Sequence, residues 1–105
     1  MDDLFEGDLR ERWRDLVERR LPEAASERRW PVRFDHCFAR ILLDVALDRP
    51  WREVVAPPAW RNTPGGDLAR AVALGEAALR GEGDMHALND RSLALRGKAG
   101  PRGRS

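Results

Sequence analysis

FDHCFARILLDVAL, residues 34–47, carries the strongest structural signal in the chain. Its apolar side chains recur at i, i+3 and i+4 spacing, which gathers them on one face of an α-helix. The members of this face are Phe34, Cys37, Phe38, Ile41, Leu42 and Val45. Asp35 suits the cap or the first turn of the helix, and the sequence Asp-Arg-Pro at residues 48–50 provides its end. The pattern predicts a core helix in which Cys37 is buried as a small hydrophobic side chain.

Helical periodicity continues upstream of this segment. It predicts a helix over residues 3–20, in which arginines are interleaved with acids as on a solvated surface. The residue before a proline avoids the helical conformation, so we expect Leu21-Pro22 to end this helix. Pro22 then suits the first turn of a short second helix over residues 22–29, and a turn or extended connection follows at residues 30–33.

Downstream, the sequence predicts one short helical turn at residues 51–55 and an ordered surface loop at residues 56–66. Thr63 followed by Pro64 has the composition of a helix start, with a capping hydroxyl and a proline in the first position. We therefore expect the next helix over residues 64–80. One face of it carries small and apolar residues, namely Leu68, Ala71, Val72, Gly75 and Leu79.

The last predicted helix spans residues 84–96, with Asp84 as its cap and a glycine next to each end. Residues 98–105 form a basic tail containing glycine and proline, which we expect to be flexible. No segment alternates apolar and polar residues as a strand does. The sequence thus predicts an all-α fold, a small compact bundle of about four main helices with one or two short helical turns, in a single domain over residues 1–97.

The composition limits the classes of protein to which the chain can belong. It has 105 residues, 42% of them apolar and 35% charged, enough for one small core. No apolar run reaches the roughly 18–20 residues of a membrane-spanning helix, and the acidic start lacks the apolar region of a signal peptide. A single cysteine excludes an internal disulfide framework, so a cytoplasmic protein is expected. Of the 19 basic residues, 18 are arginine and Lys98 is the only lysine. The 18 acidic residues bring the net charge to +1, which argues against a positive field over the whole protein.

Three reactive side chains adjoin at residues 35–37, in the sequence Asp-His-Cys. Nucleophilic catalysis by a thiolate needs a base within hydrogen-bond reach, whereas adjacent helix positions do not face each other. The sequence favours a buried Cys37 and an exposed ladder of His36, Arg40 and Asp44. A reactive pair of His36 and Cys37 is the alternative. The two histidines lack a helical metal spacing, so we predict no metal site, no cofactor and no catalytic residue.

Arginines next to tryptophans form a second group of candidates, since guanidinium groups and indoles can stack on bases or bind phosphate. Such pairs can equally anchor loops on the core while the arginine stays in solvent. With polar residues near the chain end they make up a candidate polar or anion-contacting surface: Arg28, Arg29, Arg61, Asn89, Ser92, Arg96 and Lys98. The helices expected over residues 64–80 and 84–96 also have the outline of a helix-turn-helix, to which Arg91 and the basic tail would add positive charge.

Two segments resemble a family of short bacterial proteins: RWPVRFDHCFARI at residues 29–41 and LNDRSLALRGK at residues 88–98. The resemblance covers most of residues 8–98. Members of this family have been labelled GNAT-type acetyltransferases, so the resemblance implies a protein related to acetyl transfer from acetyl-CoA. A GNAT domain is a mixed α/β fold that holds the acetyl-CoA pyrophosphate on an Arg/Gln-x-x-Gly-x-Gly/Ala turn, and residues 80–85 are the nearest approach to that turn in this chain.

Two functional hypotheses come from the residues themselves. Amphipathic helices and four tryptophans on a thin core favour a non-catalytic protein-interaction module, acting on a protein partner or as a homo-oligomer and without membrane contact. This hypothesis predicts an exposed apolar patch with at least one tryptophan. The alternative is an accessory protein that binds nucleic acid through arginines and a lysine, namely Arg28, Arg29, Arg61, Arg91, Arg96 and Lys98. An enzyme is not favoured.

Overall fold

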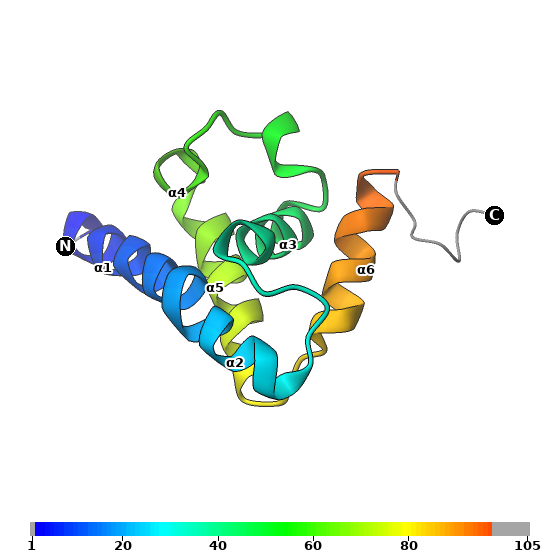
Figure 1. Ribbon diagram of the computed structural model, residues 1–105. Helices are drawn as coiled ribbons and strands as arrows, with labels where there is room; N and C mark the ends of the chain where they lie inside the picture. Colours follow the sequence, from blue (N-terminus) through cyan, green and yellow to red (C-terminus); the bar gives the residue numbers. More distant parts are fainter. Residues whose placement is uncertain (1, 98–105) are drawn as a thin grey trace.

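The computed structural model describes residues 2–97, with side chains from residue 8 onward (Figure 1). Every regular element in this range is helical, which confirms the all-α prediction. The elements are α1 (Asp2–Asp15), the π-helical turn η1 (Leu16–Arg20), α2 (Leu21–Arg28), α3 (Asp35–Leu47), the 3-10 turn η2 (Trp51–Glu53), α4 (Ala59–Asn62), α5 (Gly65–Leu79) and α6 (Met85–Leu95). None of these helices is long and apolar enough to span a membrane. The tail predicted at residues 98–105 lies outside the described range.

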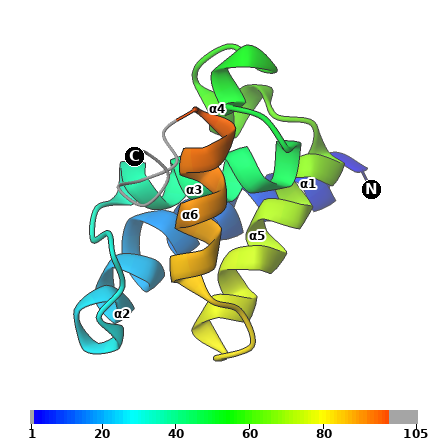
Figure 2. The same ribbon diagram turned by 90° about the vertical axis from the view of Figure 1, so that its right-hand side faces the viewer.

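The fold is organised around α3, as Figure 1 and Figure 2 show from two directions. Both α5 and α6 pack against this helix, and so does η1 of the N-terminal arm. The inner face of α3 carries Phe38, Ile41, Leu42 and Leu43, none of them more than 1% exposed. Burying one such side chain contributes about 1.5–3 kcal/mol. The helix that the apolar pattern predicts is therefore also the centre of the hydrophobic core.

The N-terminal part is one continuous helical arm, so the prediction that Leu21-Pro22 ends the first helix is wrong. Pro22 lacks an N–H, and in a regular α-helix its ring would meet the carbonyl four residues earlier. The chain accommodates the proline because η1 precedes it. There the Leu21 N–H bonds the Leu16 carbonyl five residues back, and this wider turn leaves room for the ring. Leu16 and Leu21 are both fully buried, so the widened turn keeps its two ends against the core.

The start of α3 differs from the predicted apolar stripe in two residues. Phe34 precedes the first turn with an extended backbone, and its side chain is 59% exposed. Helical periodicity does not apply to a residue outside the helix, so Phe34 is not part of the core face. Cys37 is half-buried rather than fully buried, because it faces the connection between α2 and α3 instead of another helix.

A short helix interrupts the predicted surface loop, since α4 lies within residues 56–66. Thr63 does not cap the next helix. It is fully buried, and its hydroxyl has no hydrogen-bond partner within the described part of the chain. α5 begins after Pro64, one residue later than predicted. The guanidinium of Arg10 donates hydrogen bonds to the carbonyls of Trp60 and Thr63, and these bonds tie the α4 segment to α1.

Asp84 caps α6 as predicted, and its Oδ1 accepts hydrogen bonds from the N–H groups of His86 (2.9 Å) and Ala87 (3.4 Å). Replacing Asp84 with alanine removes this acceptor and is expected to lower the free energy of unfolding by about 1 kcal/mol. Serine at this position is expected to retain most of the stability, because its hydroxyl also accepts from the first turn. Urea denaturation followed by circular dichroism tests the cap, and an equal loss in both variants would argue against it.

Candidate functional site

Arg28 is a structural residue in this fold. It reaches across to the C-terminal end of α5, where its guanidinium donates to the carbonyls of Ala78 (2.9 Å) and Leu79 (2.7 Å). Carbonyl groups in the last turn of a helix lack the usual helical partner, so these bonds satisfy the end of α5. The same guanidinium lies 5.7 Å from the centre of the Trp30 ring. Arg28 is exposed, but its guanidinium is engaged in these contacts with the end of α5 and with the Trp30 ring.

Ser92 and Arg96 face the interior, where both bind the carboxylate of Asp44. Oδ2 of Asp44 accepts from Ser92 Oγ (2.7 Å) and Arg96 Nε (2.6 Å), and Oδ1 accepts from Arg96 Nη2 (3.0 Å) and the Trp51 N–H (2.8 Å). Asp44 and Ser92 are fully buried. Several donors and one counter-charge are what a buried carboxylate needs. The prediction that Ser92 lies on a polar surface is therefore wrong, whereas the Arg96 side chain is 27% exposed and directs its guanidinium to Asp44. We call Asp44, Trp51, Ser92 and Arg96 the Asp44 cluster.

The prediction of an exposed ladder of His36, Arg40 and Asp44 on α3 is also wrong, because Asp44 is buried. Asp44 faces the interior, and Arg40 donates from Nη2 to the side-chain oxygen of Asn89 at 2.7 Å. Both of these contacts cross from α3 to α6. Because α6 packs against α3, Arg40 bonds Asn89 of α6 and Asp44 bonds Ser92 of α6. The sequence pattern instead predicts that Arg40 and Asp44 pair with each other along α3.

The described candidates for nucleic-acid contact come from several elements, and some of them are already engaged by other residues. Three of them have partners within the fold, namely Arg28, Arg91 and Arg96. The partner of Arg91 is Asp48, in an exposed ion pair. Arg29 follows α2 and Arg61 lies in α4, so the two belong to separate segments. Lys98 lies outside the described residues. The two helices of the predicted helix-turn-helix, α5 and α6, both pack on α3.

His36 and Cys37 are divided between two concave sites. Cys37 lines a pocket formed by the connection between α2 and α3, whereas His36 lines a groove on another side of α3. Neighbouring positions on a helix project about 100° apart, which accounts for the separation. The His36 ring stacks on the exposed Phe34, with ring centres 5.9 Å apart and planes at 5°. Neither an imidazole nor a carboxylate lines the pocket of Cys37, so the arrangement does not supply a base to the thiol.

Three of the four tryptophans line that groove, which has a volume of about 250 Å³. Trp13 comes from α1, Trp51 from η2 and Trp60 from α4, so distant segments converge on it. Trp13 is 2% exposed and forms the base of the groove, whereas Trp60 is 37% exposed and lies at the edge of the groove. Further apolar side chains complete the lining, namely Val17, Ala39, Leu43 and Ala59. We call this site the tryptophan groove. It meets the expectation of an exposed apolar patch that contains a tryptophan.

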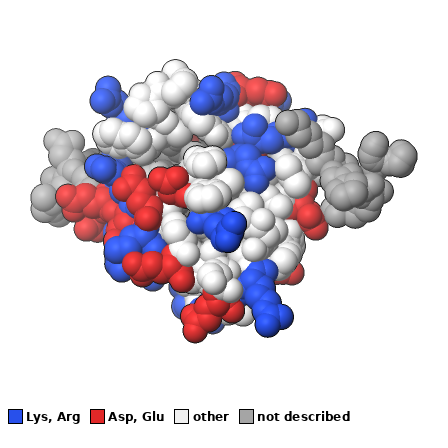
Figure 3. Space-filling model, viewed as in Figure 1, with Lys and Arg blue, Asp and Glu red and all other residues white. Residues whose placement is uncertain are grey.

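Charged side chains border the tryptophan groove. Arg14 and Arg61 place their guanidinium carbons 5.8 and 5.4 Å from the centre of the Trp60 ring. Such cation–π contacts stabilise the observed placement of the ring at the edge of the groove. Arg14 also pairs with Glu18 at 3.6 Å. Figure 3 shows the result from outside: the surface over the segment that holds α4 is largely uncharged, and the mixed charges of α1 lie beside it.

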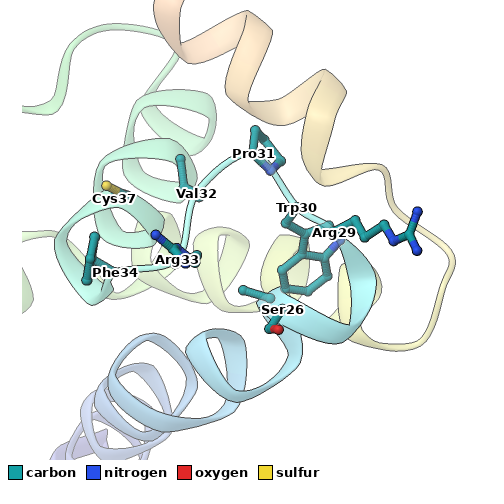
Figure 4. A pocket seen from close by; sticks show the side chains of 9 residues that line it. Ser26, Arg29, Trp30, Pro31, Val32, Arg33, Phe34 and Cys37 are labelled. Atoms are coloured by element: carbon teal, nitrogen blue, oxygen red, sulfur yellow. The ribbon is translucent and has the colours of Figure 1, made fainter.

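A second concave site, of about 580 Å³, lies along the connection between α2 and α3 (Figure 4). We call it the loop pocket. Aromatic and basic residues of one short segment line it together with Cys37 of α3; they are Arg29, Trp30, Arg33 and Phe34. All four belong to the segment RWPVRFDHCFARI at residues 29–41, where the sequence predicts a turn or extended connection but no pocket. They converge because Arg29 has a left-handed backbone with φ of 55°, which turns the chain sharply after α2.

An exposed ion pair on the helical arm changes the pKa of one surface carboxyl group. A hydrogen bond from Arg19, one turn later on the helical arm, lowers the pKa of Asp15, and the positive charge of Arg19 adds to this effect. Both residues lie outside the two concave sites. Among the side chains that the structure describes, residues 8–97, no three His, Cys, Asp or Glu lie close enough together to hold a metal ion.

Residues 80–85, the segment nearest to an acetyl-CoA turn, join α5 to α6 and thus connect two helices. The chain matches no protein-family model, and comparisons with the curated proteins and with the solved structures found no match, so the resemblance to GNAT-type acetyltransferases stays an untested prediction.

Proposed function

We propose that this chain is a non-catalytic protein-interaction module that binds an apolar side chain of a partner protein in the tryptophan groove. The observation that carries the proposal is the convergence of Trp13, Trp51 and Trp60 on one open groove. Tryptophan and arginine dominate the residues that contribute most to binding in protein interfaces. A ring that arginines hold in place loses little entropy when a partner covers it, which favours binding.

The size of the groove favours a side-chain anchor over a small-molecule ligand. Its volume of about 250 Å³ lies below the roughly 300–1,000 Å³ of small-molecule sites. Its walls are held by packing and hydrogen bonds, because Trp13 is almost fully buried and Arg10 bonds the α4 segment to α1. A leucine or aromatic side chain at the surface of a partner suits such a preformed, mainly apolar recess.

The charges at the rim indicate what should lie next to the anchor in the partner. Glu18 is already paired with Arg14. Asp35 Oδ1 accepts a hydrogen bond from the His36 N–H (2.7 Å), and among the described residues its ion-pair contact is His36 Nδ1 at 3.5 Å, which carries a charge only when protonated. An arginine or lysine of the partner would therefore complement Asp35. We infer that the partner segment carries an apolar anchor with a basic residue nearby, and that the encounter takes place in the cytoplasm, where the thiol of Cys37 remains reduced.

A peptide-display library selected against the intact protein tests the proposal. Peptides with an apolar anchor beside a basic residue are expected to be enriched, and Trp60→Ser is expected to weaken their binding at least tenfold. Val54→Ser is the matched control, because Val54 is 46% exposed and lies outside the groove. Its affinity should equal that of the unmodified protein. Equal binding by Trp60→Ser, or enrichment without an apolar anchor, would overturn the proposal.

Light scattering distinguishes a different protein from a second copy as the occupant. The proposal expects a monomer at the concentrations used for peptide binding. A dimer that dissociates in Trp60→Ser and persists in Val54→Ser would show that a second copy occupies the groove, and it would contradict the assignment of another protein as the partner.

A further inference from the structure

We propose that the loop pocket binds a small organic anion, an apolar or aromatic body that carries a carboxylate or a phosphate. This second site is independent of the tryptophan groove and of the function proposed for it. The two sites share no lining residue. Their chemistry also differs, because carboxylates border the groove whereas none lines the loop pocket.

Two arginines give the loop pocket a positive charge. Arg29 and Arg33 both line it, and neither forms an ion pair within the described residues. Arg33 lies only near the face of Phe34, 5.9 Å from the ring centre. In Figure 4, Arg33 and Trp30 lie on either side of Ser26, and Arg29 extends outward beyond Trp30. Guanidinium groups near an apolar wall bind carboxylate and phosphate well, because both can accept two parallel hydrogen bonds.

The aromatic wall of the loop pocket is held in place. The Trp30 ring packs edge-to-face on the fully buried Phe38, with centres 5.8 Å apart and planes at 68°. Arg28, which is fixed to the end of α5, lies near the same ring. The Trp30 N–H also bonds the Ala25 carbonyl at 3.1 Å. A fixed indole offers an apolar body a contact surface without a large loss of entropy.

The dimensions of the loop pocket fit a small molecule. Its volume of about 580 Å³ lies within the roughly 300–1,000 Å³ typical of ligand sites. Val32 and Pro31 add apolar surface between Trp30 and Phe34. A ligand that consisted of an anion alone would leave this apolar surface unused, and a neutral apolar ligand would leave the guanidinium groups unused. The arginines and the apolar wall together therefore favour a molecule that has both an anionic group and an apolar body.

Cys37 makes occupancy of the loop pocket measurable. It is the single cysteine of the chain, it lines the pocket and it is half-buried. A molecule seated against Trp30 and Arg33 is therefore expected to shield the thiol from a small neutral reagent such as N-ethylmaleimide. The rate of alkylation reports binding at this site alone, whatever the ligand does elsewhere on the protein.

The experiment uses phenyl phosphate and benzoate as probes, with benzyl alcohol and inorganic phosphate as their neutral and purely anionic counterparts. Phenyl phosphate or benzoate is expected to slow the alkylation of Cys37 at least fivefold at saturation, and the better of the two identifies the anionic group. Benzyl alcohol and inorganic phosphate are expected to protect much less. Absence of protection by both aromatic anions, or equal protection by benzyl alcohol, would overturn the proposal.

Variants test the role of the arginines. Arg33→Gln, alone and with Arg29→Gln, is expected to weaken the protective affinity of the aromatic anion tenfold or more. Arg52→Gln is the matched control, because Arg52 is an exposed arginine near the ring of Trp51 and outside the pocket. An unchanged alkylation rate without ligand shows that each variant keeps the fold. Undiminished protection in the double variant would overturn the assignment.

Discussion

Replacing Arg96 with alanine is expected to lower the free energy of unfolding by about 3–5 kcal/mol, the largest loss we expect from a single substitution that removes a charge. Asp44 is fully buried and receives two hydrogen bonds from the Arg96 guanidinium, at 2.6 and 3.0 Å. Alanine leaves this carboxylate buried without its counter-charge. Small domains are stable by about 5–15 kcal/mol, so a large part of the total stability would be lost.

Chemical denaturation followed by tryptophan fluorescence measures this loss, and Arg91→Ala is its control. Arg91 lies in α6 and Arg96 directly follows it, and each forms an ion pair with an acidic residue at the C-terminal part of α3 or just after it, Asp48 and Asp44 respectively. The side chains of Arg91 and Asp48 are 55% and 69% exposed, so their ion pair is expected to contribute no more than about 1 kcal/mol. If Arg96→Ala costs no more than Arg91→Ala, the Asp44 cluster does not hold α6 against α3.

Replacing Gly75 with leucine is expected to destabilise the protein by about 3 kcal/mol, because the helices cross too closely there for a side chain. A Cβ atom at this position would lie 2.7 Å from Leu16 Cδ2 and 3.0 Å from Leu42 Cδ1. Leu16 belongs to η1 and Leu42 to α3, and both are fully buried. The larger side chain would have to separate three packed elements.

Gly66→Ala is the control for this substitution. Gly66 lies in the first turn of the same helix, α5, and apart from its chain neighbours and the backbone of its own helix no described atom lies within 4 Å of where its Cβ would be. Alanine restricts the unfolded chain more than glycine does and favours the helix, so the variant is expected to gain up to about 1 kcal/mol. Thermal denaturation of both variants gives the comparison. A loss in both, or in neither, would contradict the close crossing at Gly75.

Local patterns account for most of the helices. The stripe in residues 34–47 predicts α3, the composition around Asp84 predicts the cap of α6, and the apolar face of residues 64–80 predicts α5. Each of these signals depends on residues within one or two turns of each other, which is the range over which helical spacing and capping act. The prediction failed at Pro22, because a proline rule for a regular helix does not anticipate a π-helical turn just before it.

The burial of Asp44 could not be predicted from its neighbours along α3. It follows Ile41 by three residues and directly precedes Val45, so it lies at the edge of the apolar face. Arg40, four residues earlier, suggested a surface ion pair instead. Only the packing of α6, whose Ser92 lies 48 residues away in sequence, shows that the carboxylate is buried and which donors satisfy it.

The sequence alone established an all-helical fold, most of its main helices and the Asp84 cap of α6, because helix formation is governed by neighbours along the chain. The tertiary structure assigned the partners of the charged residues and formed both concave sites. The tryptophan groove is lined by residues of α1, η2 and α4. The loop pocket forms because a sharp turn brings Trp30 and Arg33 beside α3. Partner choice and concavity depend on contacts between segments that are far apart in sequence, and helical periodicity carries no information about which segments those are.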